Sequence, residues 1–187
     1  MKKENRVFII EGIAGSGKTT FHNQLKNKLK NKIIYDFAEE ELLFSWKHAW
    51  IKDIGKIRLN FMNKLLDYIE KILKQDPNAV FILNRFHLTY PRVTDMNKNM
   101  LNKYNKLIQR LKKLPVHIYV PILKKHEIEE RASHKERKDK VWQLHMQKRL
   151  KQRGFSNLTD MYVCEQNKIL NFLKKQKIPY SLVRVKK

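Results

Sequence analysis

The octapeptide GIAGSGKT, which begins at Gly12, is the segment whose residue types and spacing predict chemistry most directly. It satisfies the pattern G-x-x-x-x-G-K-[ST] of a phosphate-binding loop. Gly12, Gly15 and Gly17 allow the backbone to curl, so that successive N–H groups can point at phosphate oxygens. Lys18 is expected to reach the β- and γ-phosphates of a nucleoside triphosphate, and the Thr19 hydroxyl is expected to ligate Mg²⁺.

The helix expected to begin near Lys18 adds the positive end of its dipole to this loop. A glycine-rich turn without a phosphate ligand would not require Lys and Thr at these positions. The loop therefore predicts a site for a nucleoside triphosphate donor together with Mg²⁺. The predicted binding residues are Gly12, Ile13, Ala14, Gly15, Ser16, Gly17, Lys18, Thr19 and Thr20.

A second group of polar residues follows the apolar run at 79–83, where the sequence continues as Asn84-Arg85. Ligands of open α/β sheets bind at the carboxyl ends of the strands, and an arginine there can form bidentate bonds with a phosphate. Arg85 is therefore a predicted catalytic residue. In proteins that handle nucleotide phosphates, such a strand usually ends in a carboxylate that helps to hold magnesium. Asn84 is a neutral amide, so we predict that it acts on Mg²⁺ through a water.

Four acids stand close together in YDFAEEEL, beyond the second predicted strand: Asp36, Glu39, Glu40 and Glu41. One explanation is the first turn of a helix, where acids interact favourably with the helix dipole. The other is that Asp36, or one of the three glutamates, supplies near Mg²⁺ or the acceptor the negative charge that Asn84 lacks. A phosphate acceptor needs no base, whereas a sugar hydroxyl needs a carboxylate within hydrogen-bond reach.

Apolar runs and helical stripes alternate along the chain and must position these groups. This alternation predicts an α/β fold, with a five-stranded parallel sheet, right-handed crossovers and helices on both faces. No repeat or linker divides the chain, so residues 1–187 are expected to form a single domain. Strands are expected at 6–11, 32–37, 79–83, 116–122 and 180–185, and helices at 18–30, 38–50, 57–74, 95–114, 123–152 and 156–175.

With EGIAGSGKTT after the first strand and NRFHLTY after the third, the sequence resembles the thymidylate kinases and the wider group of P-loop nucleoside and nucleotide kinases. Thymidylate kinases carry Asp-Arg, an aromatic residue and, three residues beyond it, a Ser on the third strand. Asn84, Arg85, Phe86 and Thr89 fall on those positions. The resemblance covers nearly the whole chain as an order of elements, but it is specific only in the loop and moderately so around Arg85.

The resemblance implies a three-layer P-loop kinase fold and an enzyme that transfers the γ-phosphate of ATP to a (deoxy)nucleoside monophosphate. Arg85 would then bind the phosphate of this small-molecule nucleotide acceptor. A helical lid at about 123–152 would supply arginines that neutralise charge on the transferring phosphoryl group. Arg131 and Arg137 are the candidates, with Lys135 and Lys138 as alternates.

Aromatic residues and one lysine could contact the acceptor base. A counted alignment places Lys64 where thymidylate kinases carry an arginine near the base, and Phe61 near a base-stacking aromatic. Helix surface and core packing explain these two residues equally well. Trp46, Trp50 and Trp142 lie on predicted amphipathic helices, and we expect them to pack in the core or the lid rather than against a base.

The charge of the chain is strongly asymmetric, with 41 Lys and Arg against 18 Asp and Glu. Residues 101–187 carry 23 of these bases and only 7 of the acids. Such an excess favours polyanionic partners, although a lysine-rich composition in general would also produce it. Two other functions therefore stay open. One is a polynucleotide kinase or nucleic-acid-dependent ATPase that binds nucleic acid through the basic C-terminal half, and the other is a non-catalytic nucleotide-binding module, which Asn84 would suit.

The remaining features concern the setting of the protein. A single cysteine, Cys164, excludes an intrachain disulfide and a cysteine-rich zinc site, and a reducing, cytoplasmic setting is the default. No apolar run approaches the roughly 18 to 20 residues of a membrane span, so no membrane partner is expected. The apolar run that begins at Val7 reads as a core strand rather than as a signal peptide. Whether the protein forms a homodimer stays open.

Overall fold

The computed structural model describes residues 4–88, 97–132 and 139–185. Five strands form one sheet in the order β2-β3-β1-β4-β5, and all four pairings are parallel. The strands are β1 (Val7–Ile10), β2 (Ile33–Phe37), β3 (Ala79–Asn84), β4 (Val116–Pro121) and β5 (Tyr180–Val183). The predicted five-stranded parallel sheet is therefore confirmed, and each strand overlaps the range expected from the sequence.

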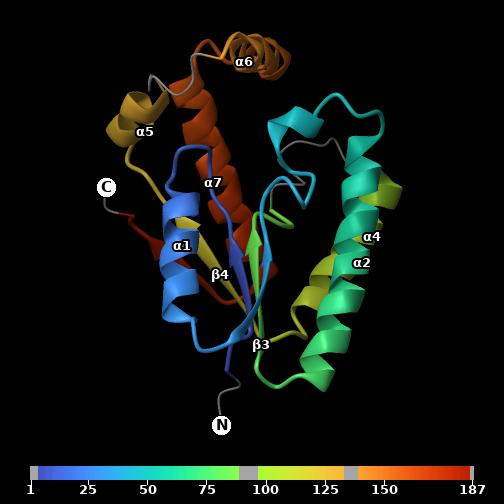
Figure 1. Cartoon of the computed structure of the whole chain (residues 1–187). Coiled ribbons are helices and arrows are strands. Elements are labelled where there is room, and N and C mark those ends of the chain that lie inside the picture. The colour runs from blue at the N-terminus through green and yellow to red at the C-terminus, as the bar shows by residue number, and fades with distance from the viewer. Residues whose placement is uncertain (1–3, 89–96, 133–138, 186–187) are drawn as a thin grey trace.

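The central strand β1 is buried on both faces, as expected for a parallel sheet between two helical layers. Because side chains alternate along a strand, Val7 and Ile9 join a core formed with α2 (Ile54–Gln75), α4 (Lys98–Leu111) and α7 (Leu158–Gln176). Phe8 and Ile10 pack on the other face with Leu25 of α1 (Lys18–Lys28). Figure 1 shows α1 and the pair α2 and α4 on opposite sides of the sheet.

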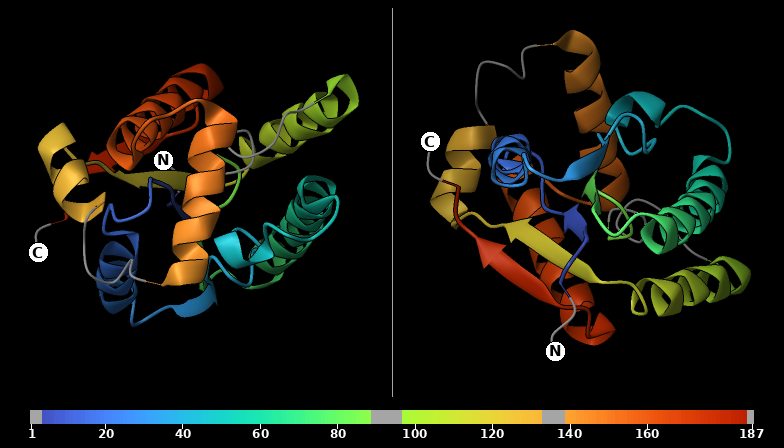
Figure 2. Two further views of the ribbon diagram at one scale, coloured as in Figure 1. Left: turned by 90° about the horizontal axis from the view of Figure 1, so that it is seen from above. Right: turned by 60° about the horizontal axis from the view of Figure 1, so that its bottom comes forward.

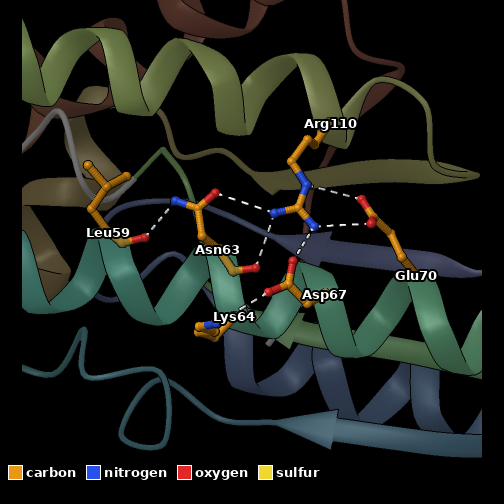
Figure 3. A network of polar contacts seen from close by, with 6 residues as sticks. All are labelled: Leu59, Asn63, Lys64, Asp67, Glu70 and Arg110. Atoms are coloured by element: carbon orange, nitrogen blue, oxygen red, sulfur yellow. Dashed lines mark hydrogen bonds and ion pairs between the residues drawn. The ribbon is translucent and has the colours of Figure 1, made fainter.

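Arg110 of α4 fixes that helix against α2 through several bonds at once (Figure 3). Its Nη2 lies 2.7 Å from Asp67 Oδ1 and 3.1 Å from Glu70 Oε2, and its Nη1 donates to the backbone oxygen of Asn63 at 3.3 Å. Hydrogen bonding to Glu70 is the main reason why the pKa of Arg110 is raised. The network holds two helices together well outside the lining of the cavity described below.

The segment 38–50 does not form the predicted helix. It consists of turns and one short 3₁₀ helix, η1 (Trp46–His48), whose cap is the Ser45 side chain. Leu43 has a left-handed backbone (φ +59°), which no regular helix can contain, and its carbonyl oxygen accepts a bond from Arg58 Nε at 2.6 Å. A tertiary contact to α2 therefore overrides the local helical pattern.

The segment 123–152, expected to be an interrupted helix, contains α5 (Lys125–Ala132) and α6 (Lys140–Arg153). Asp139 caps α6, because its Oδ1 accepts from the backbone N–H of Val141 at 2.8 Å, and Gly154 ends the helix with φ +69°. Seen from above, α6 lies across the end of the sheet at which the strands finish (Figure 2). None of the described helices is long and apolar enough to cross a membrane.

Candidate active site

The glycines of the GIAGSGKT loop are required by its shape. Gly12 has φ +153°, and a Cβ there would lie 2.8 Å from Ser16 Oγ and 3.2 Å from the carbonyl oxygen of Pro121. Gly17 has φ +90°, and a Cβ there would come within 3.0 Å of the Val185 side chain. The loop connects β1 to the first turn of α1, so its N–H groups and the start of a helix share one end of the sheet.

Lys18 lies inside the loop. Its side chain is only 7% exposed, and its Nζ donates to the carbonyl oxygen of Ile13 at 2.9 Å. Thr19 and Thr20, which follow in the first turn of α1, are exposed. The ammonium group is therefore held where the loop surrounds it, and it can exchange a backbone oxygen for a phosphate oxygen.

Two buried oxygens at this end of the sheet have no hydrogen-bond partner among the described residues: Ser16 Oγ and Asn84 Oδ1. Asn84 pairs in the sheet with Ile10, and Ile10 lies two residues before the first residue of the loop, Gly12. Mg²⁺ prefers oxygen ligands, and the protein usually supplies only a few of them while water and phosphate supply the others. Within the described ranges, no three His, Cys, Asp or Glu residues could hold a metal on their own. The unpartnered Asn84 oxygen and the exposed Thr19 fit the predicted Mg²⁺ and triphosphate.

Asp36 is bound by α1. Its Oδ1 lies 2.6 Å from His22 Nε2, and its Oδ2 lies 2.6 Å from Lys26 Nζ. These partners lie one and two helical turns beyond Lys18, and Asp36 pairs with Ile82 rather than with the end of β3. A role for Asp36 at magnesium stays a prediction, but both of its oxygens already have partners. Of the predicted acid cluster, it is Glu39 that reaches the end of β3.

Arg85 joins the end of β3 to the phosphate-binding loop. Its backbone is left-handed (φ +69°), its side chain is buried, its Nη1 donates to the Gly12 carbonyl oxygen at 3.2 Å, and its Nε donates to Glu39 Oε2 at 2.5 Å. Burial disfavours the charged form, but Glu39, with help from Glu11 and Glu165, outweighs it, and the pKa of Arg85 is raised. The side chain is therefore a fixed cation beside the loop.

Glu11, which the sequence analysis did not single out, holds the segment that carries Arg85. It is fully buried, and its Oε1 accepts from the backbone N–H groups of Phe86 and Leu88, both at 2.9 Å. His87, between them, is also buried, and its Nε2 lies 2.8 Å from Gln176 Oε1. The sequence feature that could have identified Glu11 is its position as a single acid directly after the apolar run VFII.

Replacing Glu11 with alanine should raise the KM for the acceptor that Arg85 is predicted to bind by about 10-fold or more, because each lost bond from a buried N–H group costs about 1–3 kcal/mol. Glu11→Gln should recover most of this loss, since the amide oxygen can accept the same two bonds. Steady-state kinetics of both variants, with their thermal stability, provide the measurement. If the glutamine variant fails as badly as the alanine variant while remaining folded, the carboxylate charge rather than its geometry matters.

A cavity of about 330 Å³ opens beside the loop, between β3, η1, the start of α2 and α6. Arg85 and Ala14 belong to its wall, so the cavity and the phosphate-binding loop are direct neighbours. Its lining is mostly cationic and aromatic. The basic members are Arg58, Arg85, His145, Lys148, Arg149 and Arg153, and the aromatic members are Phe44, Trp46, Trp50, Trp142 and Tyr162.

Its arginines share two carboxylates. Arg58 is buried at the start of α2, and burial is the main reason why its pKa falls to about 10, with the positive charge of Arg85 adding to this and Glu39 opposing it. On the opposite wall, Arg153 Nη1 bonds the buried Glu165 at 2.6 Å, and Arg149 bonds the same oxygen. Together, the four guanidinium groups and two carboxylates of the two walls carry a net charge of +2.

The aromatic and basic residues that the sequence analysis considered for base contacts lie in different places relative to this cavity. Trp46, Trp50 and Trp142 line it, so they do not serve only as core or lid packing. Lys64 is 86% exposed, lies 3.9 Å from Asp67 and is not part of the cavity lining. Phe61 packs against the core. The basic residue that α2 contributes to the cavity lining is Arg58, near the start of the helix.

Arg131, at the end of α5, is the predicted lid arginine that the structure describes. Its Nη1 donates to the carbonyl oxygen of Gly15 at 2.7 Å, which places it at the phosphate-binding loop. Arg137, Lys135 and Lys138 lie outside the described residues, as does Thr89 of the motif after β3. The proposed lid segment therefore contacts the loop through α5 and lines the cavity through α6.

This geometry agrees with the sequence comparison, in which residues 1–173 match the family model described as the KAP family P-loop domain. The chain belongs to this family. The match confirms that the chain is a P-loop protein, as the GIAGSGKT segment predicted. Among curated proteins, the sequence has no match.

The fold of this KAP-family chain is similar to those of several solved structures. It is similar to a thymidylate kinase from Candida albicans (17% identity, TM-score 0.61, covering 97% of this chain and 84% of that one). It is also similar to a thymidylate kinase from Ehrlichia chaffeensis (14%, 0.56, 99% and 89%) and to a deoxyadenosine kinase from M. mycoides (17%, 0.52, 95% and 89%). At these identities the likeness shows the three-layer fold of the P-loop kinases, as predicted.

Proposed function

We propose that this protein is a nucleotide kinase that transfers the γ-phosphoryl group of ATP to the phosphate of a (deoxy)nucleoside monophosphate. The observation that carries the proposal is the arginine-lined cavity that shares Arg85 with the edge of the phosphate-binding loop. The four arginines Arg58, Arg85, Arg149 and Arg153, together with Glu39 and Glu165, carry a net charge of +2, which matches the charge of a phosphate monoester dianion. Arginine is also the side chain best suited to bidentate phosphate recognition.

In this reaction an oxygen of the acceptor phosphate forms a bond to the γ-phosphorus, and the bond from that phosphorus to the β–γ bridging oxygen breaks. A nucleoside diphosphate leaves from the loop. Bound Mg²⁺ would neutralise charge on the triphosphate, and Thr19 with Asn84 through a water would support it. Lys18 would hold the β- and γ-oxygens, Arg85 would orient the acceptor, and Arg131 would lie at the loop beside the transferring group.

A second candidate reaction uses a nucleoside hydroxyl as the acceptor, and one observation favours it. Glu39 lines the cavity and bonds Arg85, so a carboxylate lies where a hydroxyl acceptor would need a general base. One protein with a similar fold is named a deoxyadenosine kinase, and deoxyadenosine is a nucleoside, which offers hydroxyl groups rather than a phosphate. We rank this reaction second because one carboxylate faces four arginines in the same cavity.

A panel of nucleoside monophosphates and nucleosides, assayed with the wild type and Glu39→Gln, tests both reactions. For a phosphate acceptor, the variant should keep kcat/KM within about 10-fold, because no base is needed and the amide oxygen still accepts from Arg85. For a hydroxyl acceptor, kcat should fall by about 10²-fold or more. If ATP is hydrolysed at a rate that no acceptor changes, neither kinase reaction is correct and the protein is a simple NTPase.

A further inference from the structure

Trp50 stands at the rim of the cavity and is 58% exposed, whereas Phe44 of the same wall is 5% exposed. A single exposed aromatic residue is ordinary on a protein surface. Trp50 differs because it belongs to the cavity lining and because a cation lies over its ring. Lys148 Nζ of α6 is 5.1 Å from the centre of the indole, within the range of a cation–π contact.

The aromatic wall continues from the interior of the cavity to this rim. The His145 ring lies 5.7 Å from Trp46, tilted by 32°, and also 5.7 Å from Trp50, which it meets at 75°. Burial, followed by the charges of Arg149 and Lys148, lowers the pKa of His145, so the ring between the two indoles is neutral near pH 7. The cavity lining thus contains one half-buried indole, Trp46, and one exposed indole, Trp50.

The charges show the same two levels. The four arginines and two glutamates of the inner wall leave +2, which one terminal phosphate dianion balances. Lys148 at the rim is outside that count, and Lys47 and Lys52 are exposed on either side of Trp50 in the sequence. A ligand that uses both levels would carry a second phosphate and a second planar group.

We propose that Trp50 and Lys148 form a second nucleotide subsite, so that the acceptor is the 5′-phosphorylated terminal nucleotide of a short single strand of nucleic acid. The terminal nucleotide would fill the cavity, the next base would stack on Trp50, and the phosphodiester between them would meet Lys148. Stacking on an exposed aromatic ring combined with a cationic contact to the backbone is how proteins bind single strands without reading their sequence.

The inference rests on the proposed function, because it places the terminal phosphate at Arg85. The chemistry is unchanged: an oxygen of the terminal 5′-phosphate bonds to the γ-phosphorus of ATP, and the bond to the β–γ bridging oxygen breaks. The products are a strand with a 5′-diphosphate end and ADP.

Dissociation constants for pdT, pdTpdT and the matching pdA series, measured at 50 and 200 mM salt, test this subsite. The dinucleotide should bind about 5- to 150-fold more tightly than the mononucleotide, since stacking of one base contributes about 1–3 kcal/mol. Its salt dependence should be steeper by about 0.7 in log–log slope for the added phosphate. Trp50→Ala should lower the affinity ratio by about 5-fold or more, because stacking is lost while the Lys148 contact stays, and Lys148→Ala should remove the extra slope.

Ile57→Ala and Lys74→Ala are the matched controls, because both residues are exposed and neither belongs to the cavity lining. They should leave the affinity ratio and the slope unchanged. Equal binding of mononucleotide and dinucleotide, or a ratio that survives Trp50→Ala, would overturn the second subsite even if mononucleotides are phosphorylated. The proposed function fails differently: then no probe of either length is phosphorylated, whatever its affinity.

Discussion

Lys18→Ala should lower kcat/KM for phosphoryl transfer by at least about 10³-fold, the range observed when a fixed cation or donor at a reacting phosphoryl or oxyanion is removed. The side chain is 7% exposed inside the loop and reaches the Ile13 carbonyl at 2.9 Å, so its charge is already placed where the triphosphate would bind. Little reorganisation is needed when the nucleotide arrives, and such preorganisation makes an electrostatic contact effective.

The fold should tolerate this substitution. The hydrogen bond from Lys18 Nζ to the Ile13 carbonyl oxygen is worth about 1.5–3 kcal/mol, and its loss is partly offset because a buried ammonium group no longer has to be desolvated. Thermal unfolding without nucleotide should change little, whereas the stabilisation produced by saturating ATP should largely disappear. Lys28→Ala is the control, since Lys28 is an exposed lysine in the last turn of the same helix. Activity of Lys18→Ala within about 10-fold of the wild type would disprove the phosphate-binding role of the loop.

The sequence predicted the sheet and the loop well, because both depend on local patterns. VFII and AVFIL are continuous apolar runs, which are typical of strands buried on both faces. The Gly-Lys-Thr spacing has a physical reason at every position. Strand ends and the start of α1 are therefore set by a few neighbouring residues, and the same residues form the donor site.

The acceptor side was harder to predict, because long-range contacts build it. Arg58 comes from the first turn of α2, and it is fixed by the Leu43 carbonyl, whose left-handed backbone could not be foreseen. Glu165 is more than a hundred residues away from Glu39 in the sequence, yet each carboxylate forms an ion pair with arginines of the same cavity. Sequence spacing alone gives no reason to connect these residues.

Asp36 shows the same limit from the opposite direction. Its place in an acidic cluster near the end of a strand suggested a role near Mg²⁺. A side chain at that position can, however, contact the neighbouring helix α1 instead of the phosphate-binding loop. His22 and Lys26 occupy both of its oxygens. No pattern in the sequence indicates that His22 and Lys26 of α1 are the partners of Asp36.

Arg85→Ala should raise the KM for the acceptor by about 10- to 150-fold and the KM for ATP much less, since a charge-assisted contact contributes about 1.5–3 kcal/mol. Both Arg and Ala are L residues with a Cβ, so the left-handed backbone (φ +69°) is equally strained in the two proteins. Arg85→Lys keeps the charge but not the planar pair of donors, and it should fall between the wild type and the alanine variant.

Truncation of Arg85 also leaves Glu39 without its partner at 2.5 Å, and this carboxylate would repel an acceptor phosphate. The double variant Arg85→Ala/Glu39→Gln separates the two effects: it should bind the acceptor better than Arg85→Ala, yet less well than the wild type. Arg110→Ala is the control for a lost structural arginine. It should lower the free energy of unfolding through the α2–α4 network without changing either KM. If Arg85→Ala instead raises the KM for ATP most, Arg85 serves the donor, and the cavity does not receive an acceptor phosphate at this residue.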